Sequence, residues 1–184
     1  MGLTTESIDN CADDQELFKL LAGELDAKLP QGEGPDLDQF LAETRRLPVG
    51  LRAMAAIYQL DVSLTLDDLG WHFANWHHRR YCEEQIWALR ELELGEAAEI
   101  FAEAYERVQP WWDKIGQLLA NDFETFVKWY SGSDLEGVMD PLTRRMWNLF
   151  EVAESQGKRK GLLESWADYA RKYPHKVTQV IKLG

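Results

Sequence analysis

Apolar residues recur with the helical period along almost the whole chain, and this pattern is the strongest constraint on the fold. It is clearest in residues 96–109, where apolar residues three and four positions apart would share one helix face. These residues are Ala97, Ile100, Phe101, Ala104, Tyr105 and Val108. No segment shows the sustained alternation that a half-buried strand requires. The sequence therefore predicts an all-α protein.

Breaks between the periodic segments predict a compact single domain of about eight to ten helices. A chain of 184 residues that is 45% hydrophobic can bury one core. Residues 1–35 are expected to form an acidic leader with one loosely docked helix, because the proline- and glycine-rich residues 30–35 cannot continue it. Residues 36–184 then form the main helical domain.

Three local signals predict where helices begin and end. Thr65 is expected to cap a helix, because Asp68 follows three residues later at the spacing of a capping box. Pro110 is expected to begin one long helix that reaches Tyr130. Gly95 is expected to separate two further helices.

The net charge of −12 is unevenly distributed along the chain. By segment it is −9 for residues 1–43, +1 for 44–90, −9 for 91–140 and +5 for 141–184. A field of this sign repels nucleic acid and anionic membranes and attracts basic protein surfaces. We therefore expect no direct binding to nucleic acid, although acidity that serves only solubility remains an alternative.

The location of the protein is expected to be cytoplasmic. The longest apolar runs are too short to cross a bilayer, and the N-terminus has acids where a signal peptide would need bases. Cys11 and Cys82 are the only cysteines and make no disulfide framework. Reduced thiols and no membrane contact are expected.

A row of carboxylates runs along the predicted helix of residues 96–109, opposite its apolar face. Glu96, Glu99, Glu103 and Glu106 are spaced three, four and three residues apart, and Asp113 follows in the next segment. Regularly spaced negative charges can imitate a phosphate backbone to a basic groove. The alternative is an ordinary solvated helix face.

The residues with most potential for chemistry lie between His72 and Glu84. His78 and Cys82 are four residues apart and would share a helix face, which makes them weak candidates for metal ligands. No further donors complete a zinc site, and no nucleophile with a base or glycine-rich phosphate loop is present. We expect no metal, no cofactor and no catalysis. A metal- or thiol-dependent enzyme that uses His72, His78 and Cys82 is the remaining alternative.

Eight tryptophans are many for this length, and at helical spacing most are expected in the core. The neighbouring Trp111 and Trp112 cannot both face inward on one helix. One of them is therefore expected at a groove or an interface.

Three segments, Gly70-Trp71-His72-Phe73-Ala74-Asn75, residues 86–92 and residues 97–104, resemble an acidic all-helical bacterial family named for a DNA-mimic protein. Asp140-Pro141-Leu142, then Trp147, Phe150, Tyr169 and Pro174, resemble its closing pattern, so that the resemblance covers roughly residues 45–178. Gly70, Trp71, Phe73 and Asn75 are the fold signature. The family's usual Asn-Gly-Gly turn is here Asp68-Leu69-Gly70. The resemblance implies a helical domain without a cofactor; its namesake binds a DNA-binding protein in place of DNA.

The leading expectation is a non-catalytic binding protein that presents Glu96, Glu99, Glu103, Glu106 and Asp113 to a basic partner. A DNA-binding regulator is the partner that the resemblance implies. An immunity-type inhibitor of a nuclease toxin is the alternative, because acidity would also suit a basic active-site cleft. The sequence predicts no particular oligomeric state.

Overall fold

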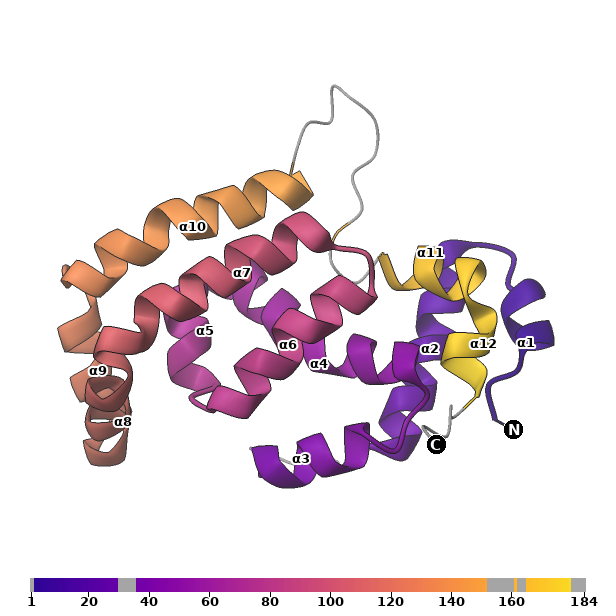
Figure 1. Cartoon of the computed structure of the whole chain (residues 1–184), viewed down its shortest axis with the longest axis horizontal. Helices are drawn as coiled ribbons and strands as arrows, with labels where there is room; N and C mark the ends of the chain where they lie inside the picture. The colour runs from indigo at the N-terminus through magenta and orange to yellow at the C-terminus, as the bar shows by residue number, and fades with distance from the viewer. Residues whose placement is uncertain (1, 30–35, 152–160, 162–164, 180–184) are drawn as a thin grey trace.

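The computed structural model describes residues 2–29, 36–151, 161 and 165–179. These residues form helices and no strands, which confirms the all-α prediction (Figure 1). The α-helices are α1 (Thr5–Asp9), α2 (Asp14–Lys28), α3 (Leu37–Thr44), α4 (Val49–Leu66), α5 (Leu69–Asn75), α6 (Arg79–Glu91), α7 (Gly95–Val108), α8 (Trp112–Asn121), α9 (Phe123–Tyr130), α10 (Asp134–Glu151), α11 (Ser165–Lys172) and α12 (Pro174–Thr178), with a 3-10 helix η1 (Gln109–Trp111) before α8.

The centre of the molecule is the long helix α4, which is buried along most of its length. It packs against α6, and α6 packs against α7, which in turn packs against α10. Figure 1 shows α5, α8 and α9 at one end of this arrangement and α1, α2, α11 and α12 at the other. One connected hydrophobic core runs through the described helices. Of those helices, none is long and apolar enough to cross a membrane.

The N-terminal helix α2 contributes to this core. Leu17 and Leu21 are fully buried, and the ring of Phe18 lies 5.4 Å from that of Trp166 on α11. The proline- and glycine-rich residues 30–35 that were predicted to end this helix lie outside the described residues.

The prediction that Thr65 caps a helix is wrong. Helix α4 continues through Leu66, and the Thr65 hydroxyl donates to the Asp61 carbonyl inside it at 2.9 Å. Asp68 is the cap of α5, because its carboxylate accepts the Trp71 N–H at 2.9 Å. The same carboxylate also accepts the Tyr130 hydroxyl at 2.9 Å, and this tertiary contact holds Asp68 in the capping position.

The predicted single helix from Pro110 to Tyr130 is also wrong. The chain breaks at Asp122, whose backbone is extended between α8 and α9. The Asp122 carboxylate accepts both the N–H and the hydroxyl of Thr125 at 2.7 Å, so it caps a new helix.

Helix α6 ends before Gly95, in a turn whose left-handed residue is Glu93 at φ 62°. The Leu94 N–H donates to the Leu89 carbonyl at 2.8 Å and the Glu93 N–H to the Arg90 carbonyl at 3.1 Å. This is a Schellman turn, in which glycine usually takes the place of Glu93. Gly95 is instead the first residue of α7.

Candidate functional site

The predicted carboxylate row lies on the outer face of α7. Glu96, Glu99 and Glu106 are exposed, and Glu103 is partly buried. The opposite face of the helix is buried, with Ala97, Ile100, Phe101, Ala104 and Val108 in the core. Because the core holds this helix along four turns, the row has a fixed orientation towards solvent.

The middle of the row is paired with arginines from both sides. Arg90 of α6 lies 2.9 Å from Glu99. Glu103 lies 3.0 Å from Arg107 and 2.6 Å from Arg145 of α10. The hydrogen bond from Arg145, followed by that from Arg107, lowers the pKa of Glu103 below its usual value. The central carboxylates are therefore charged but largely neutralised by their neighbours.

The two ends of the row differ from its middle. Within the part of the chain that the structure describes, neither Glu96 nor Glu106 forms an ion pair. Asp113, on α8, is 92% exposed and lies 3.8 Å from Arg79, which also sits 4.9 Å over the ring of Trp112. Glu96, Glu106 and Asp113 are thus the predicted site residues with the most freedom to meet an outside cation.

The basic C-terminal block of the sequence packs against the acidic blocks. Besides the Arg145 contact with Glu103, Lys172 lies 2.6 Å from Glu93, Lys176 lies 2.7 Å from Glu91 and Arg171 lies 3.2 Å from Asp14. Sequence reasoning did not foresee these pairs, although the segment charges of −9 and +5 were a signal that such blocks could meet. Part of the net charge is consequently hidden from a partner.

The predicted fold signature serves packing at the α5 end of the molecule. A Cβ on Gly70 would overlap the Tyr130 hydroxyl and lie 2.5 Å from its Cζ, so only glycine fits there. Trp71 packs edge-on against Tyr130 at 5.6 Å, and Phe73 is fully buried against Phe101 at 5.4 Å. Asn75 is exposed at the end of α5.

The histidines and the cysteine of the α5–α6 region do not converge. His72 is fully buried, with Ser63 at 2.9 Å and Gln85 at 3.0 Å, and burial lowers its pKa to about 4. Burial also raises the pKa of the Cys82 thiol. His78 caps α6 by accepting the Tyr81 N–H at 3.2 Å. Among the described residues, no three His, Cys, Asp or Glu side chains are placed to hold a metal ion.

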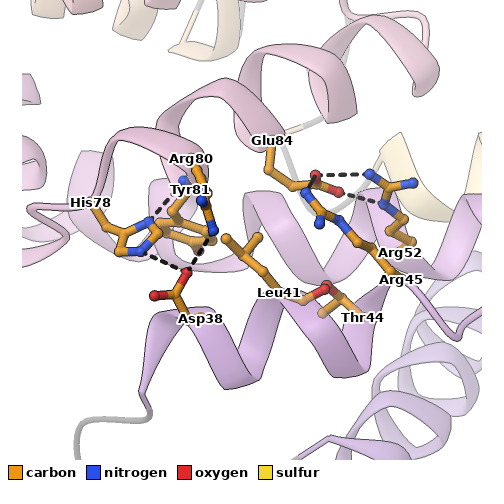
Figure 2. Close-up of polar contacts among 9 residues, drawn as sticks. All are labelled: Asp38, Leu41, Thr44, Arg45, Arg52, His78, Arg80, Tyr81 and Glu84. Atoms are coloured by element: carbon orange, nitrogen blue, oxygen red, sulfur yellow. Dashed lines mark hydrogen bonds and ion pairs between the residues drawn. The ribbon is translucent and has the colours of Figure 1, made fainter.

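Polar contacts join α3 to α6, as Figure 2 shows. Asp38 lies 3.3 Å from His78 and 3.4 Å from Arg80. Further along, the buried Glu84 accepts hydrogen bonds from Arg52, whose guanidinium lies 4.0 Å over the ring of Trp87. Removing one partner of such a buried pair destabilises a fold strongly, so we assign Glu84 a structural role.

The neighbouring tryptophans take different environments. Trp112 is buried and stacks on His77 at 4.3 Å, whereas Trp111 is partly buried on η1. That one of them lies at an interface remains a prediction.

Comparison of the chain with protein-family models, with curated proteins and with solved structures finds no match. The resemblance to the DNA-mimic family therefore stays a prediction.

Proposed function

We propose that this is a non-catalytic binding protein that presents the outer face of α7 to a basic partner protein. The observation that supports it is the carboxylate row on a helix that the core holds in place. Glu96 and Glu106 are ten residues apart, or about 15 Å along the helix axis. Four carboxylates over that length are spaced roughly 5 Å apart, against 3.4 Å between the phosphates of a DNA strand, although paired arginines neutralise much of the charge of Glu99 and Glu103.

The paired arginines determine how such a partner would bind. In the free protein Glu99 is paired with Arg90, and Glu103 is paired with Arg107 and Arg145. An incoming basic side chain must therefore compete with these arginines. Glu96 and Glu106, which form no ion pair with any described residue, attract a partner without this competition. Exposed ion pairs are weak and screened by salt, and binding should therefore be strongly salt-dependent.

The same charge pattern supports a class of partner. A basic groove that accepts phosphates would also accept a row of carboxylates, and the resemblance to a DNA-mimic family favours a DNA-binding regulator. Two of the residues that a metal- or thiol-dependent enzyme would use, His72 and Cys82, are buried in the core. Their burial supports a role without catalysis.

Affinity capture from the source cells tests the proposal. The wild-type protein and a Glu96→Lys/Glu106→Lys variant are immobilised, lysate is applied at low salt, and proteins eluted by a salt step are quantified by mass spectrometry. The matched control is Glu6→Lys/Asp9→Lys, which makes the same charge change at exposed positions on α1. We expect a basic DNA-binding protein to be captured by wild type and control but lost from the α7 variant.

Two outcomes would contradict the proposal. Equal capture by the α7 variant and by wild type would exclude the row as the contact surface. Recovery of no specific protein would make the acidity a matter of solubility. Capture of a nuclease whose toxicity is relieved by co-expression would favour the immunity-type alternative.

A further inference from the structure

An exposed aromatic side chain, Phe123, lies at the end of the molecule formed by α5, α8 and α9. Among the described residues, the exposed large hydrophobic side chains are Tyr58, Leu66 and Phe123, at 44%, 73% and 52% exposure. Phe123 begins α9, and its ring lies 5.7 Å from that of the half-buried Trp71. The two rings form a pair that is only partly covered by the protein itself.

A hydrogen bond ties this pair of rings to the start of α5. The Asp68 carboxylate accepts the hydroxyl of Tyr130, whose ring packs against Trp71 at 5.6 Å. We call Trp71 and Phe123 the aromatic end.

The core fixes the aromatic end in place. Trp71 packs edge-on against the buried Phe126 at 5.3 Å, and Phe126 stacks on Tyr130 at 5.5 Å. An apolar surface supported by buried rings keeps its shape without a partner, and a preformed surface loses less conformational entropy on binding.

Carboxylates surround this apolar surface. Asp67 precedes Asp68, whose carboxylate accepts the Tyr130 hydroxyl, and Asp122 and Glu124 adjoin Phe123; Asp67, Asp122 and Glu124 are exposed. Lys128 lies 2.8 Å from Glu124, whereas Asp67 and Asp122 form no ion pair with any described residue.

We propose that the aromatic end is a docking surface for a basic amphipathic helix of a partner protein. The apolar face of this partner helix would cover Trp71 and Phe123. The lysines or arginines of the partner helix would meet Asp67, Asp122 and Glu124. A second copy of this chain would bring the same carboxylates against each other, and like charges across an interface oppose association. The surface shares no residue with the carboxylate row of α7, so the inference stands whether or not that row binds a partner.

Binding of a synthetic peptide tests this inference. The probe is a fluorescein-labelled, 18-residue helical peptide of leucine and lysine with one apolar face, and its fluorescence anisotropy is measured against protein concentration. A scrambled peptide of the same composition keeps the charge but has no apolar face. We expect the amphipathic peptide to bind at least about tenfold more tightly than the scrambled one, because an apolar anchor contributes much of such an interface.

Variants locate the binding surface. Phe123→Ser should weaken binding of the amphipathic peptide by about tenfold or more, and Asp67→Asn should reduce its salt dependence. Tyr58→Ser, which removes the exposed aromatic of α4, should leave the affinity unchanged. Circular dichroism checks that each variant is folded.

Three results would overturn the inference. The scrambled peptide could bind as tightly as the amphipathic one, which would reduce the effect to net charge. Folded Phe123→Ser could bind like wild type. The wild-type protein could also self-associate in size-exclusion chromatography in a way that Phe123→Ser abolishes, which would assign the surface to a second copy.

Discussion

Replacing Gly70 by alanine should destabilise the protein, although alanine is usually the better residue in a helix. The added methyl group would overlap the phenol of Tyr130 and force it away from Asp68. Losing a hydrogen bond to a charged acceptor costs about 1.5–3 kcal/mol, and crowding a packed core costs about 1–3 kcal/mol more. Alanine returns about 1 kcal/mol of helix propensity. The expected net loss of unfolding free energy is about 3 kcal/mol.

Urea denaturation followed by circular dichroism measures this loss. Gly23→Ala is the matched control, because Gly23 is an exposed residue of α2 whose added Cβ would meet nothing within 4 Å. That variant should gain up to about 1 kcal/mol. In a double-mutant cycle, Gly70→Ala with Tyr130→Leu should cost less than the sum of the two single changes. If Gly70→Ala and Gly23→Ala had the same unfolding free energy, the role of the Tyr130 contact would be refuted.

Three further predictions concern buried or strained residues. The pKa of His72 is about 4 in the folded protein, below its usual value of 6.5. As the pH falls, the unfolded state therefore binds a proton before the folded state does. The free energy of unfolding should fall by up to about 3 kcal/mol between pH 6.5 and pH 4, as measured by urea titrations. His72→Gln should lose that dependence, and an unchanged slope would contradict the assignment. Glu93→Gly should be about 1 kcal/mol more stable than Glu93→Ala, because both lose the same side-chain contacts and only alanine keeps the left-handed strain; equal melting temperatures would argue otherwise. In the native protein a thiol reagent should modify the partly exposed Cys11 and leave the buried Cys82 unmodified until the chain unfolds. Rapid modification of both thiols in the native protein would contradict the fold around Cys82.

Local patterns predicted the helices well where the period was long and unbroken. The apolar face of residues 96–109 became the buried face of α7, and the carboxylates opposite it face solvent. Boundaries were less predictable when two good capping residues competed. Asp68 caps α5 through the Trp71 N–H, and its carboxylate also accepts the hydroxyl of Tyr130, 62 residues away, a partner that no local signal contains.

The candidate site shows the same difference between what local patterns predict and what tertiary contacts decide. The spacing of Glu96, Glu99, Glu103 and Glu106 placed them on one face, since the helical period depends only on local geometry. Which of them are neutralised depends on Arg90 and Arg145, which come from α6 and α10. Spacing along one helix cannot reveal cations that other helices supply.

The sequence by itself therefore determined the helical class, the buried face of α7 and the sign of the net charge, because these follow from residue type and local period. Only the tertiary structure decided how the charged blocks neutralise one another, why position 70 must be glycine, and that Phe123 remains exposed beside Trp71. Each of those depends on side chains far apart in the chain that meet only when the helices pack.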